Sequence, residues 1–161
     1  MLKLTKKADY GLIALRHLAM SARQDESSSA KQIAEMYGVP LPLLSKVLQR
    51  LARTGFLESL QGTNGGYRLA KPSTEISVLE VIHTIDGPVI LTSCFQHESD
   101  CDHVANCTVR EPLRKVHDAI SNLLNSITIA DISTGDIPAG SPARKTAGGN
   151  TLVALEEFVR S

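Results

Sequence analysis

The sequence predicts a mainly α-helical fold with one small β-hairpin. Two short helical segments, residues 30–37 and 42–54, flank a turn that contains two prolines, and two short strands follow around an Asn-Gly turn. Farther along, apolar residues recur every three or four positions over residues 109–127, as on one face of a long helix. A short helix, a turn, a basic helix and a hairpin, in this order, are typical of a winged helix-turn-helix. We therefore predict a winged helix-turn-helix followed by a long dimerisation helix.

The helices of the first 54 residues have their own start and stop signals. Residues 5–22 carry apolar side chains at helical spacing and form an amphipathic helix. Ser29 and Gln32 make a capping box that opens the helix at residues 30–37. Pro42 suits the first turn of the next helix, because proline cannot continue the preceding one. The apolar side of this basic helix consists of Leu44, Val47, Leu48 and Leu51.

A β-hairpin follows the basic helix. Residues 56–61 and 66–70 are predicted as its strands, joined by Gly62-Thr63-Asn64-Gly65. Asn64 and Gly65 favour a tight hairpin turn, because both residue types tolerate positive φ. This hairpin is the predicted wing.

The second half of the chain contains a connecting helix, a cysteine loop and a long helix. Ser77 and Glu80 form a second capping box, which opens a helix that ends near residue 85. The apolar seam of the long helix consists of Leu113, Val116, Ile120, Leu124 and Ile127. Because a winged helix nearly closes its own core, we expect this seam to pair with its copy in a homodimer.

The predicted division of the chain follows from these elements. The last part is rich in Gly, Pro, Ser, Thr and Ala, a composition typical of flexible segments, although residues 151–160 can form a short helix. The predicted parts are the winged helix-turn-helix (1–72), the connecting helix (73–92), the cysteine loop (93–108), the dimerisation helix (109–132) and a flexible tail (133–161).

The net charge of zero hides an asymmetry between the two halves. Residues 1–71 carry eleven Lys and Arg against five Asp and Glu, whereas residues 72–161 carry six against twelve. A basic front half suits contact with phosphates. The sequence has no signal-peptide pattern or membrane-spanning apolar run, so we expect a cytoplasmic protein without membrane contact. No nucleophile–base pair or paired catalytic carboxylates stand out, which argues against an enzyme.

The second helix of such a motif enters the major groove of DNA, and the wing reaches the backbone or the minor groove. The predicted partner is double-stranded DNA with a palindromic operator, since a dimer presents two such helices. An alternative is a winged helix that serves protein contacts only. The expected DNA contacts are Ser45, Lys46, Gln49 and Arg50 from the helix and Gln61, Asn64 and Arg68 from the wing.

The only cysteines of the chain are Cys94, Cys101 and Cys107, separated by six and by five residues. An odd number of thiols in a reducing compartment argues for a metal or redox role rather than a disulfide framework. Soft thiolates suit iron–sulfur clusters, zinc and copper(I). Structural zinc is the main chemical alternative, but its ligands usually come in closely spaced pairs, and both gaps here are wider.

Three sequence features together resemble the Rrf2 family of bacterial transcription regulators. They are Leu-Thr-Lys-Lys-Ala-Asp-Tyr-Gly-Leu at residues 4–12, Gly-Thr-Asn-Gly-Gly-Tyr-Arg-Leu at residues 62–69, and a three-cysteine loop before a long helix. The resemblance implies a dimeric winged-helix regulator that holds an iron–sulfur cluster on the three cysteines. Within the family, Leu-Pro at residues 41–42 and Cys-Thr-Val-Arg at residues 107–110 are most similar to regulators of the Suf cluster-assembly operon. The implied function is repression or tuning of iron–sulfur assembly genes.

The resemblance leaves the fourth cluster ligand open. IscR-like members place a histidine three residues after the last cysteine, where this chain has Arg110. NsrR-like members use an aspartate from the first helix of the partner subunit, and Asp9 matches that position. His97 and His103 are further candidates. We expect a [2Fe–2S] rather than a [4Fe–4S] cluster; the functional alternatives are a nitric-oxide or redox sensor of the same family and a winged helix with structural zinc.

Overall fold

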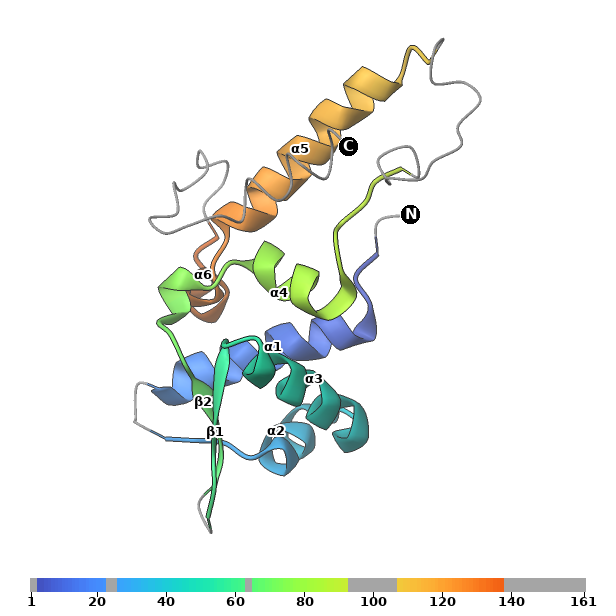
Figure 1. Ribbon diagram of the computed structural model, residues 1–161. Coiled ribbons are helices and arrows are strands. Elements are labelled where there is room, and N and C mark those ends of the chain that lie inside the picture. The colour runs from blue at the N-terminus through green and yellow to red at the C-terminus, as the bar shows by residue number, and fades with distance from the viewer. Residues whose placement is uncertain (1–2, 23–25, 63–64, 93–106, 138–161) are drawn as a thin grey trace.

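The computed structural model describes residues 3–22, 26–62, 65–92 and 107–137 (Figure 1). Among the described residues it contains seven helical segments and two strands, a mainly helical fold with one hairpin, as predicted. No helix in these ranges is both long and apolar enough to cross a membrane. The elements are α1 (Lys6–Ser21), α2 (Ala30–Tyr37), α3 (Leu41–Arg53), β1 (Leu57–Leu60), β2 (Gly66–Leu69), the 3-10 helix η2 (Ser73–Glu75), α4 (Val78–Asp86), α5 (Arg110–Ser126) and α6 (Ile129–Thr134).

Helix α1 is the centre of the fold. In Figure 1 it crosses the middle of the molecule, with α2 and α3 on one side and α4 and α6 on the other. Its buried residues include Ala8, Gly11 and Ala14, whose small size lets neighbouring helices come close. A Cβ atom on Gly11 would overlap Cδ1 of Ile85 and lie 3.3 Å from Cγ1 of Val47. Gly11 therefore sets the close approach of α4 and α3 to α1.

The helix-turn-helix forms as its local signals predicted. The Ser29 N–H donates to Gln32 Oε1 at 2.7 Å, and the Gln32 N–H donates to Ser29 Oγ at 3.2 Å. Gly38 ends α2 in the left-handed region at φ +63°. Helix α3 begins at Leu41, one residue before the predicted start, and buries the four apolar residues predicted for it. These residues join α1 and α2 in one core.

The hairpin is confirmed, but its turn differs from the prediction. The strands pair antiparallel, with Leu57 opposite Leu69 and Leu60 opposite Gly66. Positive φ occurs at Gly62, at +114°, and not at Gly65. Gly65 is needed for another reason: a Cβ there would lie 2.5 Å from the Leu60 carbonyl oxygen. Close backbone packing, rather than a left-handed conformation, therefore explains this glycine.

A third short segment joins the hairpin. The N–H of Ser28 donates to the carbonyl of Tyr67 at 3.1 Å, and the N–H of Tyr67 donates to the carbonyl of Ser28 at 2.9 Å. A Cβ atom on Gly66 would lie 2.6 Å from the Ser28 carbonyl carbon and oxygen, so only glycine fits. The wing is thereby fixed to the residues that open α2.

The single helix predicted over residues 109–132 is two helices. Helix α5 ends at Ser126, and α6 begins at Ile129 behind its own capping box, with Asp131 Oδ2 accepting from the Thr128 N–H at 2.8 Å. The junction pairs with the start of α4: the Val78 N–H donates to the Ile127 carbonyl, and the Ile129 N–H donates to the Ile76 carbonyl, both at 2.9 Å. The sequence Thr-Ile-Ala-Asp at residues 128–131 is the overlooked signal. Residues 133 and 134, predicted as tail, belong to α6.

His17 connects α1 to α2 and to the edge of the wing. One ring nitrogen is hydrogen-bonded to the Tyr37 hydroxyl at 3.2 Å and the other to the Ser28 hydroxyl at 2.9 Å. Burial lowers the pKa of His17 below its ordinary value. On α4, burial and then the charge of His117 lower the pKa of His83. Both rings are thus disfavoured as cations in the folded protein.

These two histidines are expected to make the protein less stable in mild acid. The unfolded chain binds protons near pH 6.5, whereas the folded state binds them only at a lower pH, so the unfolded state holds more protons in between. The free energy of unfolding should therefore be highest above about pH 6.5 and fall as the pH drops through the lowered pKa values. Urea unfolding at several pH values between 7.5 and 5 measures this slope. His17→Gln and His83→Gln should each flatten it; a stability that stays constant or rises toward pH 5 would contradict the assignment.

Candidate DNA-binding surface and cysteine site

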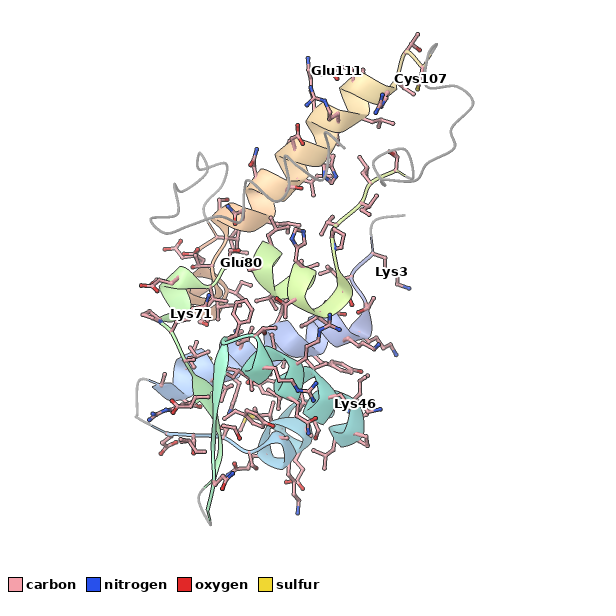
Figure 2. All side chains as sticks on the ribbon, in the orientation of Figure 1. Lys3, Lys46, Lys71, Glu80, Cys107 and Glu111 are labelled. Carbon is pink, nitrogen blue, oxygen red and sulfur yellow. The ribbon has the colours of Figure 1, made fainter. Side chains whose placement is uncertain are left out.

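The exposed face of α3 carries most of the polar residues predicted to contact DNA. Lys46, Gln49 and Arg50 are exposed, and Figure 2 shows Lys46 at the outer side of α3. Ser45 is only half-buried rather than exposed, because it lies at the border of the apolar face. Arg53 is also exposed at the last turn of the helix. The face is therefore basic toward its C-terminal end.

The wing presents Gln61 and Arg68 to solvent, whereas Asn64 lies outside the described residues. The hairpin register places Arg68 directly opposite Glu58. Arg68 Nε and Nη2 both lie 2.9 Å from Glu58 Oε2. An exposed ion pair of this kind contributes only about 0.2–1 kcal/mol. It therefore orients Arg68 on the strand without preventing a phosphate from taking its place.

Cys107 is the one predicted cysteine ligand within the described residues. It is half-buried, is not in a disulfide, and lies three positions before the first residue of α5. Cys94, Cys101, His97 and His103 lie outside the described residues. In the described part of the chain, no three His, Cys, Asp or Glu side chains gather in a way that could hold a metal ion.

Several charged side chains follow Cys107 in the first turns of α5. Three basic residues, Arg110, Arg114 and Lys115, lie in the first turns of α5. The Arg114 guanidinium donates to Glu111 at 2.7 and 3.0 Å and so holds the pKa of that carboxyl below its usual value. In donor chemistry, Cys107 fits a ligand of a thiolate-bound iron centre, because it is a free cysteine outside any disulfide.

Asp9 lies in the first turn of α1 and is exposed. Figure 2 shows Cys107 at the outer end of α5, away from α1. One chain therefore does not bring Asp9 and Cys107 together. This arrangement leaves Asp9 available to a second chain.

The two ends of the cysteine loop leave from different places. Thr5 Oγ1 donates to Asp86 at 2.6 and 2.9 Å, which ties the start of α1 to the end of α4. The chain therefore leaves α4 toward the loop beside the first turn of α1, and it returns at Cys107 to the outer end of α5.

Within the described residues, the predicted dimerisation face of α5 is only partly covered. In α5, only Ser126 is buried. Val116 of the predicted seam is 47% exposed, and Leu123, which lies outside the predicted seam, is 46% exposed. The other predicted seam residues, Leu113, Ile120, Leu124 and Ile127, are half-buried. Figure 1 shows α5 projecting from the body of the molecule, and in the described part of the chain Val116 and Leu123 remain exposed on it.

Comparison with known families gives a match over most of the chain. The protein-family model described as "Rrf2: Iron-dependent Transcriptional regulator" matches residues 4–135 of this chain. Protein aau3 of Rhizobium meliloti is 35% identical over 160 residues, which cover 99% of this chain and 96% of that protein. The transcriptional regulator NsrR of Halalkalibacterium halodurans is 33% identical over 136 residues, covering 84% and 92%. The regulator IscR of Vibrio parahaemolyticus is 32% identical over 133 residues, covering 83% and 78%.

Solved structures agree with this match. CymR, titled the global cysteine regulator of B. subtilis, superposes with a TM-score of 0.71 at 26% identity and covers 84% of this chain and 98% of its own. T. potens IscR superposes with a TM-score of 0.64 at 25% identity and covers 95% and 96%. The fold is therefore that of these winged-helix regulators. By sequence and by fold, the chain belongs to the Rrf2 family of transcriptional regulators.

Proposed function

We propose that this protein is a homodimeric repressor of iron–sulfur (Suf) assembly genes that binds a palindromic operator and senses an iron–sulfur cluster. The observation that carries the proposal is the position of Cys107, a free thiol three residues before a helix on which Val116 and Leu123 are exposed. The relatives named IscR and NsrR support a sensing role. Such a regulator works in the cytoplasm and is not an enzyme.

The proposed ligands are Cys94, Cys101 and Cys107, with the partner subunit's Asp9 as the fourth. When bound, the cluster supplies iron that reacts with oxygen or nitric oxide, and we favour the [2Fe–2S] type. Three thiolates in one short loop repel one another, so cluster binding and ordering of the loop are coupled. The loop joins the ends of α4 and α5, and its ordering therefore acts on the position of α5.

A continuous set of contacts connects α5 with the DNA-binding residues. The junction of α5 and α6 pairs with the start of α4 through the hydrogen bonds of Val78 and Ile129. Ile129 is fully buried in the core that also contains Leu44 and Leu48 of α3. A shift of α5 that follows cluster binding at Cys107 is therefore transmitted to α3 through elements that pack against one another. A coupling of about 1–3 kcal/mol would change DNA affinity by roughly 5–150-fold.

Anaerobic purification of the full chain tests the proposal. We expect a coloured protein with a cluster absorption spectrum, near-equal iron and acid-labile sulfide, and salt-sensitive binding to duplex DNA. A colourless protein with bound zinc would favour the structural-zinc alternative. A protein without either metal that still binds its operator normally would refute the sensing role.

A nitric-oxide sensor is the second candidate function. The observation that favours it is Arg110 at the position of the IscR-like histidine, together with Asp9 at the position of the NsrR-like aspartate. Titration of the clustered protein with nitric oxide under anaerobic conditions separates the two functions. Release from DNA on addition of nitric oxide would support nitric-oxide sensing, whereas release only on cluster loss under iron starvation would support control by cluster supply.

Arg50→Ala is expected to weaken operator binding and to lower its dependence on salt. Loss of one phosphate contact should reduce the slope of log K against log salt by about 0.9. If Arg50 instead binds a guanine edge, the substitution lowers the binding free energy by about 1–3 kcal/mol, and only for operators with that guanine. Fluorescence anisotropy over a range of salt concentrations measures the affinity and its salt slope.

Arg114→Ala is the matched control, because Arg114 is an exposed arginine on α5, paired with Glu111. It should leave the salt slope unchanged. An Arg50→Ala protein that binds like the wild type at every salt concentration would remove Arg50 from the DNA contacts.

A further inference from the structure

The first turn of α3 presents an apolar surface at the end of the helix that the proposed function places in the major groove. Pro40 and Pro42 are exposed, and Leu41 is 39% exposed. Pro42, Lys46, Gln49 and Arg53 follow one another at steps of four, three and four residues, so they share one face of α3. The exposed face is therefore apolar at its N-terminal end and polar or basic along the rest.

This apolar end can make almost no hydrogen bonds to DNA. Pro40 and Pro42 have no backbone N–H. The N–H groups of Leu43 and Leu44 donate to the Pro40 carbonyl at 3.2 and 3.0 Å. Helix α3 also has no side-chain cap at this end. Apart from the Leu41 amide, the first turn thus offers hydrocarbon only, which distinguishes it from the N-terminus of a helix that binds phosphate through free amides.

One group on the floor of the major groove matches a hydrocarbon surface. The four base pairs present donors and acceptors there, and only thymine adds an apolar group, its C5-methyl. The N-terminal residues of a recognition helix are also the ones that contact base edges. A guanine or cytosine at this position would face Leu41 and Pro42 with polar groups that lose water without a partner.

We propose that Leu41 and Pro42 read the methyl group of a thymine in each half-site of the operator. This inference rests on the proposed DNA-binding function and adds a specificity to it. Lys46, Gln49 and Arg50 then hold the phosphates and the polar base edges, while the first turn of α3 selects an A·T pair by apolar contact.

Replacement of thymine by uracil in the DNA tests the proposal, because uracil pairs identically and lacks only the methyl group. Duplexes that bind the full-length, anaerobically purified protein are first selected from a random library. Each thymine of the selected duplex is then replaced by uracil in turn. Binding should weaken about fourfold at one position of a half-site and about fifteenfold when both half-sites are changed, as expected for loss of one methyl contact each.

Variants assign the effect to the first turn. Leu41→Ser and Pro42→Ser are compared on thymine and uracil duplexes, with circular dichroism as the check on folding. At least one of them should bind both duplexes equally, at the affinity of the wild type for uracil. Lys46→Ala should bind more weakly overall and still prefer thymine, because it leaves the apolar turn intact.

Three results would overturn the inference. Selected duplexes without a thymine at a constant position in each half-site would do so, as would a wild-type protein that tolerates uracil at every position. A preference for thymine that persists in both serine variants would assign the methyl contact elsewhere. If no duplex is enriched at all, the proposed DNA-binding function itself fails, which is a distinguishable outcome.

Discussion

Cys107→Ser is expected to remove the cluster almost completely. Serine keeps the size of the side chain but replaces a soft thiolate by a hydroxyl that stays protonated at neutral pH and binds iron poorly. Iron and sulfide per chain should fall by at least about tenfold in anaerobically purified protein, with loss of the cluster absorption. The change should spare the fold, because Cys107 lies outside the hydrophobic core.

Two further variants make this experiment specific. Val109→Ala is the matched control, since Val109 is 56% exposed beside Cys107 and carries no ligand atom, and its iron content should stay at the wild-type level. Asp9→Asn should leave a cluster that forms but is lost faster in air, because it removes a charged ligand of the partner subunit and keeps the shape of the side chain. Full iron and sulfide in Cys107→Ser would reject the cysteine assignment.

Ile129→Ala is expected to destabilise the protein by about 2–5 kcal/mol. Ile129 is fully buried, and its side chain belongs to the core cluster that contains Leu15 and Leu18 of α1. Truncation leaves a cavity at the point where α6 holds the end of α5 against the rest of the fold. Because small domains have a total stability of about 5–15 kcal/mol, the loss is a large part of it. Urea unfolding followed by circular dichroism measures the free energy.

Ile137→Ala is the control for this change. The same atoms are removed from a side chain that is 55% exposed, and the expected cost is within about 0.5 kcal/mol. Equal losses in the two variants would mean that α6 does not belong to the core. A larger loss in Ile129→Ala, with weaker operator binding at temperatures where the protein is still folded, would support transmission from α5 through α6.

The helix-turn-helix could be predicted almost to the residue. Its boundaries depend on short-range chemistry: the reciprocal hydrogen bonds of Ser29 and Gln32, the left-handed Gly38, and Pro42 in a first turn. The four apolar residues of α3 recur at helical spacing, and all four are buried. Such signals act within a few residues, so the sequence alone contains them.

Errors arose where a local signal had two interpretations. The dimerisation helix was predicted through residue 132, although the Thr128 and Asp131 side chains cap a new helix there. At the hairpin, Gly62 has a positive φ, whereas Gly65, which was expected to have one, does not. Contacts with residues elsewhere in the chain decide both outcomes. The start of α6 pairs with Ile76 and Ser77, and Gly65 lies against the Leu60 carbonyl oxygen.

The amino-acid sequence by itself determined the order of the elements, the basic recognition helix and the presence of three thiols before a long helix, because capping, turn and spacing signals are local. Only the tertiary structure decided which surfaces remain available. It buries Ile129 and leaves Val116 and Leu123 exposed. It pairs Arg68 with Glu58, and it exposes a first turn of α3 in which the Leu43 and Leu44 amides already donate to the Pro40 carbonyl. The reason is that exposure and hydrogen-bond partners depend on residues far apart in the chain, which only packing brings together.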